Sequence, residues 1–337
     1  WWIWTNTITQ GRIAESLPWA QRLLAETRES GEVRIFGHAT AAITHFLLGQ
    51  LVEANEHAER GLAAYDPQHA DRWIQLTGHD LRTFIEVYAC QWIWMMGYPN
   101  RAIRMADQSK AHAQTVGHAF NLVWALTFGA YTFAYRREPE RLLERLTEVD
   151  RLAREQGLAF IYQVSAPQAE GLAQLQNGRP QEAITLLRAG IESWTRVGGH
   201  VRTPYLKSAL AQALALQGDM DAALNLIDEC IEQIERPAWQ ERVWLAEILR
   251  LKGWMLMRQG RDDEAETQLR AAIDCARRQQ AKSWELRSTT TLAELLAHRS
   301  RRDDARELLA PVYNWFTEGF DTKDLIDAKA LLDELSA

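Results

Sequence analysis

The stretch that decides the fold is RTPYLKSALAQALALQGDMDAALNLIDECIEQIE, residues 202–235. Apolar residues recur at helical spacing on both sides of Gly218, so the stretch reads as helix, tight turn, helix. Gly218 can adopt the positive φ that ends a helix, and Asp219 can cap the helix that follows. Ala211 and Ala223 are small where the two helices cross, which allows the helices to approach closely.

The same pattern recurs along the whole chain at intervals near 40 residues. The turn position is occupied by Gly49, Gly97, Arg137, Gly178, Gly218, Gly260 and Ser300. Seven positions before each turn stand Ala42, Cys90, Ala130, Gly171, Ala211, Gly253 and Ala293. Five positions after it stand Ala54, Ala102, Leu142, Ala183, Ala223, Ala265 and Ala305, of which only Leu142 is not small. Self-similarity at this period is typical of a solenoid, in which each unit buries its apolar face against its neighbours.

We therefore predict an all-α, right-handed α-solenoid of helix–turn–helix repeats, about 40 residues each, with roughly 15–17 helices and the first helix of each unit on the inside. Besides the pair within 202–235, the expected helix pairs are 33–48/51–65, 80–96/99–115, 118–135/139–156, 160–176/180–197, 239–259/262–279 and 284–299/302–318.

The chain is predicted to form one domain over residues 1–337. A partial repeat over 1–31 precedes repeats at about 32–70, 78–116, 117–157, 158–199, 200–237, 238–281 and 282–319. A helix over 321–336, capped by Asp321 or Thr322, is expected to close the C-terminal end of the stack. The irregular segment 65–73 is expected to be a surface loop or a helix extension.

Composition excludes several classes of function. The 337 residues carry a net charge of −7, which argues against a nucleic-acid surface. The densest apolar stretch, residues 92–96, is far too short to span a membrane. Three cysteines are expected to be buried packing residues in a reducing cytoplasm. The start WWIWTNT has no initiator methionine and indicates a piece of a longer polypeptide.

No motif for catalysis stands out. The sequence has no GxSxG, GxGxxG or CxxC motif and no HExxH or His/Cys cluster with metal-ligand spacing. We therefore predict no enzymatic activity, no cofactor and no metal site.

The concave face is the predicted binding surface, because solenoids of this type bind along the groove that the first helices line. The groove-facing positions of each first helix are counted from its small residue. The groove is expected to change from aromatic to charged along its length. The candidate binding residues are Phe84, Gln91, Trp94, Trp124, Tyr131, Tyr135, Tyr205, Arg250, Trp254 and Arg258. Four rings, Trp94, Trp124, Tyr131 and Trp254, are expected to contribute most. In the alternative, the superhelix is tightly wound and these rings pack between helices.

The repeat resembles the tetratricopeptide repeat in its longer 40-residue form. The tail over residues 281–335, AKSWELRSTTTLAELLAHRSRRDDARELLAPVYNWFTEGFDTKDLIDAKALLDEL, is similar to the C-terminal end of bacterial signalling ATPases of the STAND type. Those proteins carry a class III nucleotide-cyclase or DNA-binding effector domain. The resemblance implies that the array is the sensor or scaffold that controls the ATPase. This chain has no GxxxxGK[ST] phosphate loop, so the ATPase would lie upstream, or the resemblance is to the array alone.

The leading hypothesis is a cytoplasmic, non-catalytic sensor or interaction scaffold. Its partner would be a protein or peptide, including other domains of the same polypeptide, and binding would favour one superhelical curvature. The first alternative is a stand-alone adaptor that binds a peptide or helix. The second is a small-molecule sensor whose Trp-lined pocket holds an apolar or sugar ligand.

Overall fold

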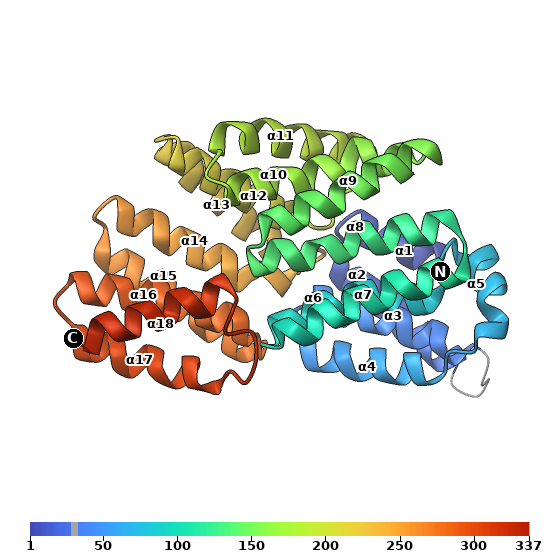
Figure 1. Ribbon diagram of the computed structural model, residues 1–337, viewed down its shortest axis with the longest axis horizontal. Helices are drawn as coiled ribbons and strands as arrows, with labels where there is room; N and C mark the ends of the chain where they lie inside the picture. The colour runs from blue at the N-terminus through green and yellow to red at the C-terminus, as the bar shows by residue number, and fades with distance from the viewer. Residues whose placement is uncertain (28–32, 337) are drawn as a thin grey trace.

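The computed structural model describes residues 1–27 and 33–336, which form eighteen α-helices and no β-strand (Figure 1). The helices are α1 (Trp2–Thr9), α2 (Ile13–Glu26), α3 (Arg34–Leu47), α4 (Leu51–Ala63), α5 (Ala70–Thr77), α6 (Leu81–Met95), α7 (Pro99–Val116), α8 (Ala119–Arg136), α9 (Pro139–Glu155), α10 (Ala166–Gln176), α11 (Pro180–Arg196), α12 (Thr203–Leu216), α13 (Met220–Glu235), α14 (Leu245–Arg258), α15 (Asp262–Arg278), α16 (Lys282–His298), α17 (Arg302–Trp315) and α18 (Lys323–Ser336). The end of the expected partial repeat, residues 28–31, and residue 32 lie outside the described residues.

The all-α solenoid is confirmed, and all seven expected helix pairs are present. Helices α10 and α14 begin six residues later than expected and α17 ends three residues earlier, whereas the other ends agree within two residues. Each of the seven turn positions has a positive φ, including the two without glycine, Arg137 at 60° and Ser300 at 61°. The left-handed conformation therefore belongs to the turn itself, and glycine is only its least strained occupant.

The small residues that recur before and after each turn lie where the paired helices cross. Ala211 and Ala293 are completely buried. A Cβ atom at Gly171 would meet Leu187 Cγ at 2.7 Å, and one at Gly253 would meet Leu269 Cγ at 2.6 Å. Close helix approach is thus the steric reason for the small-residue pattern.

The segment 65–73 differs from both expectations. Asp66 accepts a hydrogen bond from the backbone N–H of Gln68 and starts a 3₁₀ turn, η1 (Pro67–His69), which leads into the separate helix α5. Trp73 of α5 is buried and stacks on Phe36, with ring centroids 5.9 Å apart. This extra helix takes the count above the expected 15–17.

Two inner helices begin irregularly. A π-helical turn, η2 (Ile161–Ser165), precedes α10, and a 3₁₀ turn, η3 (Arg242–Trp244), precedes α14. At the C-terminus, the Thr322 hydroxyl donates to Gly319 O at 2.6 Å.

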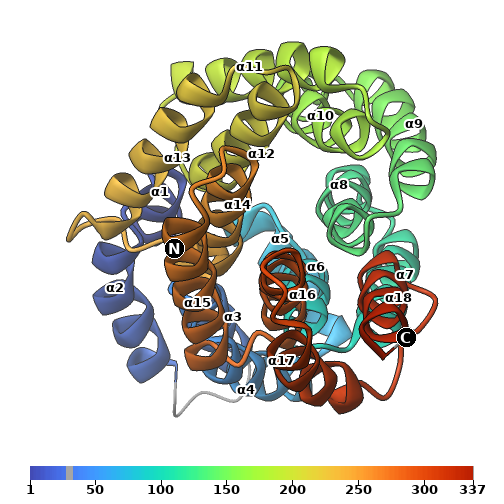
Figure 2. The ribbon, with the colours of Figure 1, turned by 90° about the vertical axis from the view of Figure 1, so that its left-hand side faces the viewer.

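The superhelix is tightly wound, so that its second turn lies on its first. The chain passes once round from α2 to α14, and α14–α18 then lie over the start of the array (Figure 2). The backbone N–H of Ala14 donates to Ala238 O at 3.2 Å, and the Ser283 hydroxyl donates to Trp94 O at 2.6 Å. Helices that are five units apart in the sequence therefore pack directly against each other.

The first helix of each pair lies on the inner side of this ring. Figure 2 shows α8, α10 and α12 inside and α9, α11 and α13 outside. Helix α18 comes 41 positions after α16, counting from Lys282 to Lys323, and therefore occupies the place of another inner helix.

Candidate functional site

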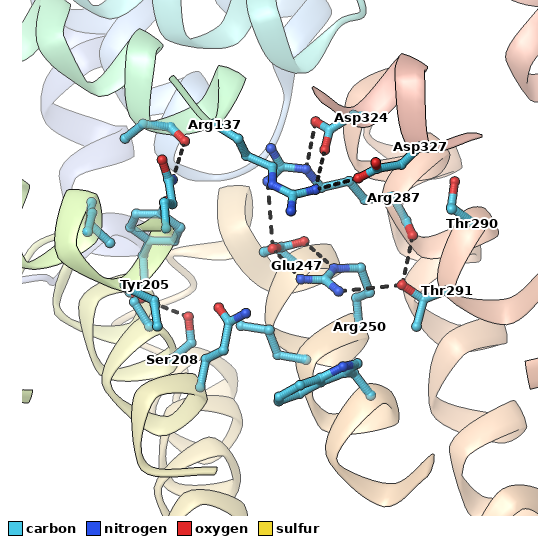
Figure 3. A pocket seen from close by; sticks show the side chains of 18 of the residues that line it. Arg137, Tyr205, Ser208, Glu247, Arg250, Arg287, Thr290, Thr291, Asp324 and Asp327 are labelled. Carbon is cyan, nitrogen blue, oxygen red and sulfur yellow. Dashed lines mark hydrogen bonds and ion pairs between the residues drawn. The ribbon is translucent and has the colours of Figure 1, made fainter. Parts of the chain in front are cut away.

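One hollow, which we call the second-turn cavity, is lined by the inner helices α8, α10, α12, α14, α16 and α18 and by Arg137 at the end of α8 (Figure 3). Its volume is about 340 Å³. The lining residues are Ala134, Arg137, Leu172, Leu175, Gln176, Tyr205, Ser208, Ala209, Gln212, Glu247, Arg250, Leu251, Trp254, Arg287, Thr290, Thr291, Glu294, Asp324 and Asp327.

One wall of the second-turn cavity carries a bidentate ion pair on α14. Arg250 Nε and Nη2 each lie 2.7 Å from a carboxylate oxygen of Glu247, and Arg250 Nη1 donates to the Thr291 hydroxyl at 3.4 Å. Burial favours the neutral acid, but the Arg250 guanidinium outweighs it and holds the pKa of Glu247 below its ordinary value.

A second ionic group joins α18 to α8 and α16. Arg287 Nε lies 2.8 Å from Asp324, whose carboxylate also lies 3.4 Å from Arg137 Nη1. Arg137 Nη1 lies 3.1 Å from Asp327 as well (Figure 3). Arg287 also donates to Tyr135 O. All three arginines of the cavity are therefore already paired with carboxylates.

Within the described residues, the second-turn cavity has polar atoms without a hydrogen-bond or ion-pair partner, among them atoms of two amides and of one carboxyl group. The Oε1 atom of Gln176 has no hydrogen-bond partner, and Gln212 makes no hydrogen bond. Glu294 lies on the cavity wall without an ion pair. The half-buried ring of Trp254 adds an apolar surface beside them. A ligand would thus meet two amides, one carboxylate and one indole.

The inside of the first turn forms a separate hollow of about 120 Å³, which we call the first-turn chamber. Its lining residues are Trp1, Trp4, Thr5, Ile8, Thr9, Ile43, Leu47, His79, Phe84, Tyr88, Trp124, Phe128, Tyr131, Phe160, Val164, Ser165, Gln168, Trp194, Val201 and Arg202. The first-turn chamber is lined mainly by aromatic and aliphatic side chains, whereas charged side chains line much of the second-turn cavity.

The ten candidate residues fall into four places. Phe84, Trp124 and Tyr131 line the first-turn chamber, and Tyr205, Arg250 and Trp254 line the second-turn cavity. Gln91, Trp94 and Tyr135 are buried between the two hollows, and Arg258 is exposed outside both of them, with its guanidinium 5.2 Å from the Trp254 ring centroid.

The expectation that Trp94 faces an open groove is wrong. Its side chain is 2% exposed, stacks on Tyr135 and meets Trp284 edge-on. Arg287 lies over its ring at 4.9 Å. Tyr131, at 1% exposed, is similarly enclosed under Arg202. Helix α16 of the second turn covers Trp94, and Arg202 at the start of α12 covers Tyr131, so both rings pack between helices as in the tightly wound alternative.

Sequence reasoning missed the contribution of α18. Asp324 and Asp327 complete the second-turn cavity, although the helix was expected only to close the end of the stack. The repeat spacing contained the signal, because it places α18 where an inner helix belongs. The repeat pattern predicts Arg137 only as a turn residue and does not point to Gln176 as a lining residue.

The described part of the chain holds no group of three or more His, Cys, Asp or Glu side chains arranged to bind a metal ion. Within the same part, no helix is both long and apolar enough to cross a membrane. All three cysteines are buried and free.

Two segments match family models of the tetratricopeptide repeat, residues 169–234 and residues 245–278. Comparison with curated protein sequences gives no match.

Solved structures show the same fold at low sequence identity. A Rap protein complexed with competence and sporulation factor is 12% identical, with a TM-score of 0.60 over 99% of this chain and 95% of that one. NprR in complex with its cognate peptide NprX is 13% identical, with a TM-score of 0.58 over 90% and 82%. The Rap conjugation regulator of plasmid pLS20 with the Phr* peptide is 10% identical, with a TM-score of 0.52 over 90% and 96%. This chain thus contains tetratricopeptide repeats and has the fold of tetratricopeptide-like helical solenoids.

Proposed function

We propose that this chain is a non-catalytic sensor domain that binds a short peptide, or an extended segment of a protein partner, in the second-turn cavity. The observation that carries the proposal is the convergence of six inner helices on one polar cavity of about 340 Å³. Two structural neighbours, NprR and the pLS20 Rap regulator, were solved in complex with peptides, and this supports the ligand class.

The uncommitted groups define the kind of peptide. Gln176 and Gln212 present amide atoms that can pair with peptide backbone groups. Glu294 offers a carboxyl group whose pKa is raised by burial, so a basic group on the ligand would favour its charged form. Arg137, Arg250 and Arg287 are already paired with carboxylates. An acidic peptide would have to displace those carboxylates, so we propose a peptide that carries a basic group.

Signal transmission would use the closure of the ring. A peptide in the second-turn cavity contacts both α8 and α18, and it would therefore favour the arrangement in which these helices are held together. We propose that this shift controls an ATPase and effector attached to the chain in its cytoplasmic, full-length form. In a stand-alone adaptor the same cavity would bind its partner without such a switch.

The test is a selection of short random peptides displayed on phage against the immobilised domain, followed by fluorescence anisotropy with an enriched peptide. We expect Glu294→Gln, Gln212→Ala and Trp254→Ala each to weaken binding by about tenfold or more. The matched control is Glu192→Gln on outer helix α11, where Glu192 is 70% exposed and paired only with Arg196. Failure to enrich any peptide, or equal binding by all four variants, would overturn the proposal.

A further inference from the structure

The first-turn chamber contains one charged side chain whose surroundings are almost entirely aromatic. Arg202 is 7% exposed and lines the chamber. Its guanidinium lies 4.2 Å from the ring centroid of Tyr131 and 4.9 Å from that of Trp244. Its Nη1 donates to the Tyr135 hydroxyl and its Nη2 to Gln91 Oε1, both at 3.1 Å.

All of these partners are neutral. In the described residues, no carboxylate lies within ion-pair distance of the Arg202 guanidinium. Buried charges in proteins are ordinarily paired, because an isolated ion loses its hydration without compensation. Arg202 is therefore a buried cation that lacks its anion.

The nearest acid does not supply that anion. Glu241 is completely buried, and its Oε1 accepts the backbone N–H of Arg202 at 2.6 Å, while its Oε2 has no hydrogen-bond partner. Burial raises the pKa of Glu241 to about 8. Burial thus favours the protonated carboxyl, so Glu241, which attracts the Arg202 guanidinium from beyond ion-pair distance, compensates its charge only in part.

The other lining side chains carry no second positive charge. Burial lowers the pKa of His79 to about 4, so this ring is neutral at pH 7. Thr5 Oγ1, His79 Nδ1 and Trp124 Nε1 have no hydrogen-bond partner in the described structure. The lining side chains thus offer one cation and a few neutral polar atoms, which suits a monoanion better than a phosphate dianion.

The volume and the lining of the first-turn chamber indicate the size and the chemistry of the uncharged part of the ligand. A volume of about 120 Å³ is comparable to the apolar cavity of about 150 Å³ that holds benzene in another protein. The walls include Phe84, Tyr88, Trp124 and Phe128, which form a continuous chain of ring contacts. Such walls favour a single aromatic ring over a sugar, whose hydroxyls would find few partners.

We propose that the first-turn chamber binds a small aromatic monocarboxylate, with its ring among the aromatic side chains and its carboxylate paired with Arg202. This site is separate from the peptide site proposed in the second-turn cavity, so each can fail without the other. Arginine suits the role because its planar guanidinium matches the geometry of a carboxylate.

The probes are phenylacetate, its uncharged analogue phenylacetamide, and acetate, which lacks the ring. Binding to the full chain is measured by isothermal titration calorimetry and by quenching of tryptophan fluorescence. We expect phenylacetate to bind at least about tenfold more tightly than phenylacetamide, since a charge-assisted bond replaces a neutral one, and acetate to bind weakest.

Two variants test the site. Arg202→Met should abolish the preference for the acid over the amide, and Tyr135 would retain the hydrogen bond from Trp244 Nε1 at 3.0 Å. Val164→Phe should fill the chamber and remove binding of both probes while Arg202 stays in place. Arg196→Gln, on the exposed outer face of α11, is the control that should change nothing.

The outcomes separate cleanly. A preference for phenylacetate that disappears in Arg202→Met, or binding lost in Val164→Phe if the first variant does not fold, supports the proposal. Equal binding of acid and amide would overturn the role of Arg202. No binding of either probe would overturn the site itself.

Discussion

The carboxylate of Asp324 lies 3.4 Å from Nη1 of Arg137, a residue 187 positions earlier in the chain, and 2.8 Å from Nε of Arg287. This single side chain joins the last helix of the array to α8 and α16. Helix α18 is therefore part of the cavity wall rather than only the end of the stack.

Asp324→Ala should lower the free energy of unfolding by about 2–4 kcal/mol, because it leaves the largely buried Arg287 without its closest carboxylate. Urea denaturation measures the change. Asp333→Ala on the same helix is the control, since Asp333 is 65% exposed and pairs only with Lys329. Equal stability of the two variants would show that the ionic contact does not hold α18 in place.

Ala211→Leu and Ala293→Leu should each destabilise the fold by about 1–3 kcal/mol, because both sites are completely buried at helix crossings. Ala102→Leu should behave in the same way. The matched control is Ala330→Leu on the exposed side of α18, where a change within about 0.5 kcal/mol is expected. If the denaturation midpoints of these variants matched that of Ala330→Leu, the small residues at the helix crossings would not be required for close helix packing.

Trp94→Ala and Trp254→Ala should separate packing from binding. Trp94 is enclosed by Tyr135 and Trp284, so its removal should cost about 3–5 kcal/mol of stability. Trp254 is only half-buried beside the second-turn cavity, and its removal should chiefly weaken peptide binding. Denaturation and anisotropy on both variants check the two effects. Stronger loss of peptide binding than of stability in Trp94→Ala would contradict this assignment.

Stability should fall as the pH is lowered from about 6.5 to about 4. Burial, and then the neighbouring His45 and His38, lower the pKa of His57 to about 4. The His38 and His57 Nδ1 atoms lie 3.0 Å apart. The unfolded chain, in which histidine has its ordinary pKa of about 6.5, binds more protons than the folded chain in this window. The contribution of neutral His57 to the free energy of unfolding is therefore fully present above pH 6.5 and is lost as the pH falls toward 4.

His57→Gln should make this loss shallower in denaturation experiments across the same pH range. Some slope should remain, because burial also lowers the pKa of His79 to about 4. Identical slopes for the variant and the parent would indicate that His57 is not held neutral by the fold.

The sequence was sufficient for the features that depend on neighbours along the chain. Arg137 and Ser300 were assigned as turns from spacing alone, and both have the positive φ that the turn requires. The spacing from the small residue of each first helix predicts Tyr205, Arg250 and Trp254 as groove-facing, and all three line one cavity.

The features that depend on the winding of the superhelix could not be predicted from the local pattern. Trp94 occupies a groove-facing register but is covered by Trp284, which lies 190 residues later. The turn-to-turn distance depends on small rotations between units that accumulate over five repeats. Arg202 was missed for the same reason, since its partners Gln91 and Tyr135 belong to other units.

The contact between turns also limits how such a chain can change its length in evolution. In an open solenoid a unit can be duplicated or lost with little effect on the others, because each unit touches only its neighbours. Here Ser283 bonds to the backbone of Trp94, and Ala14 bonds to that of Ala238. Inserting one 40-residue unit between these partners would bring every surface of the second turn opposite the wrong surface of the first. The number of units in the first turn is therefore constrained by the fit between turns, and growth of the array is tolerated only beyond its last contact.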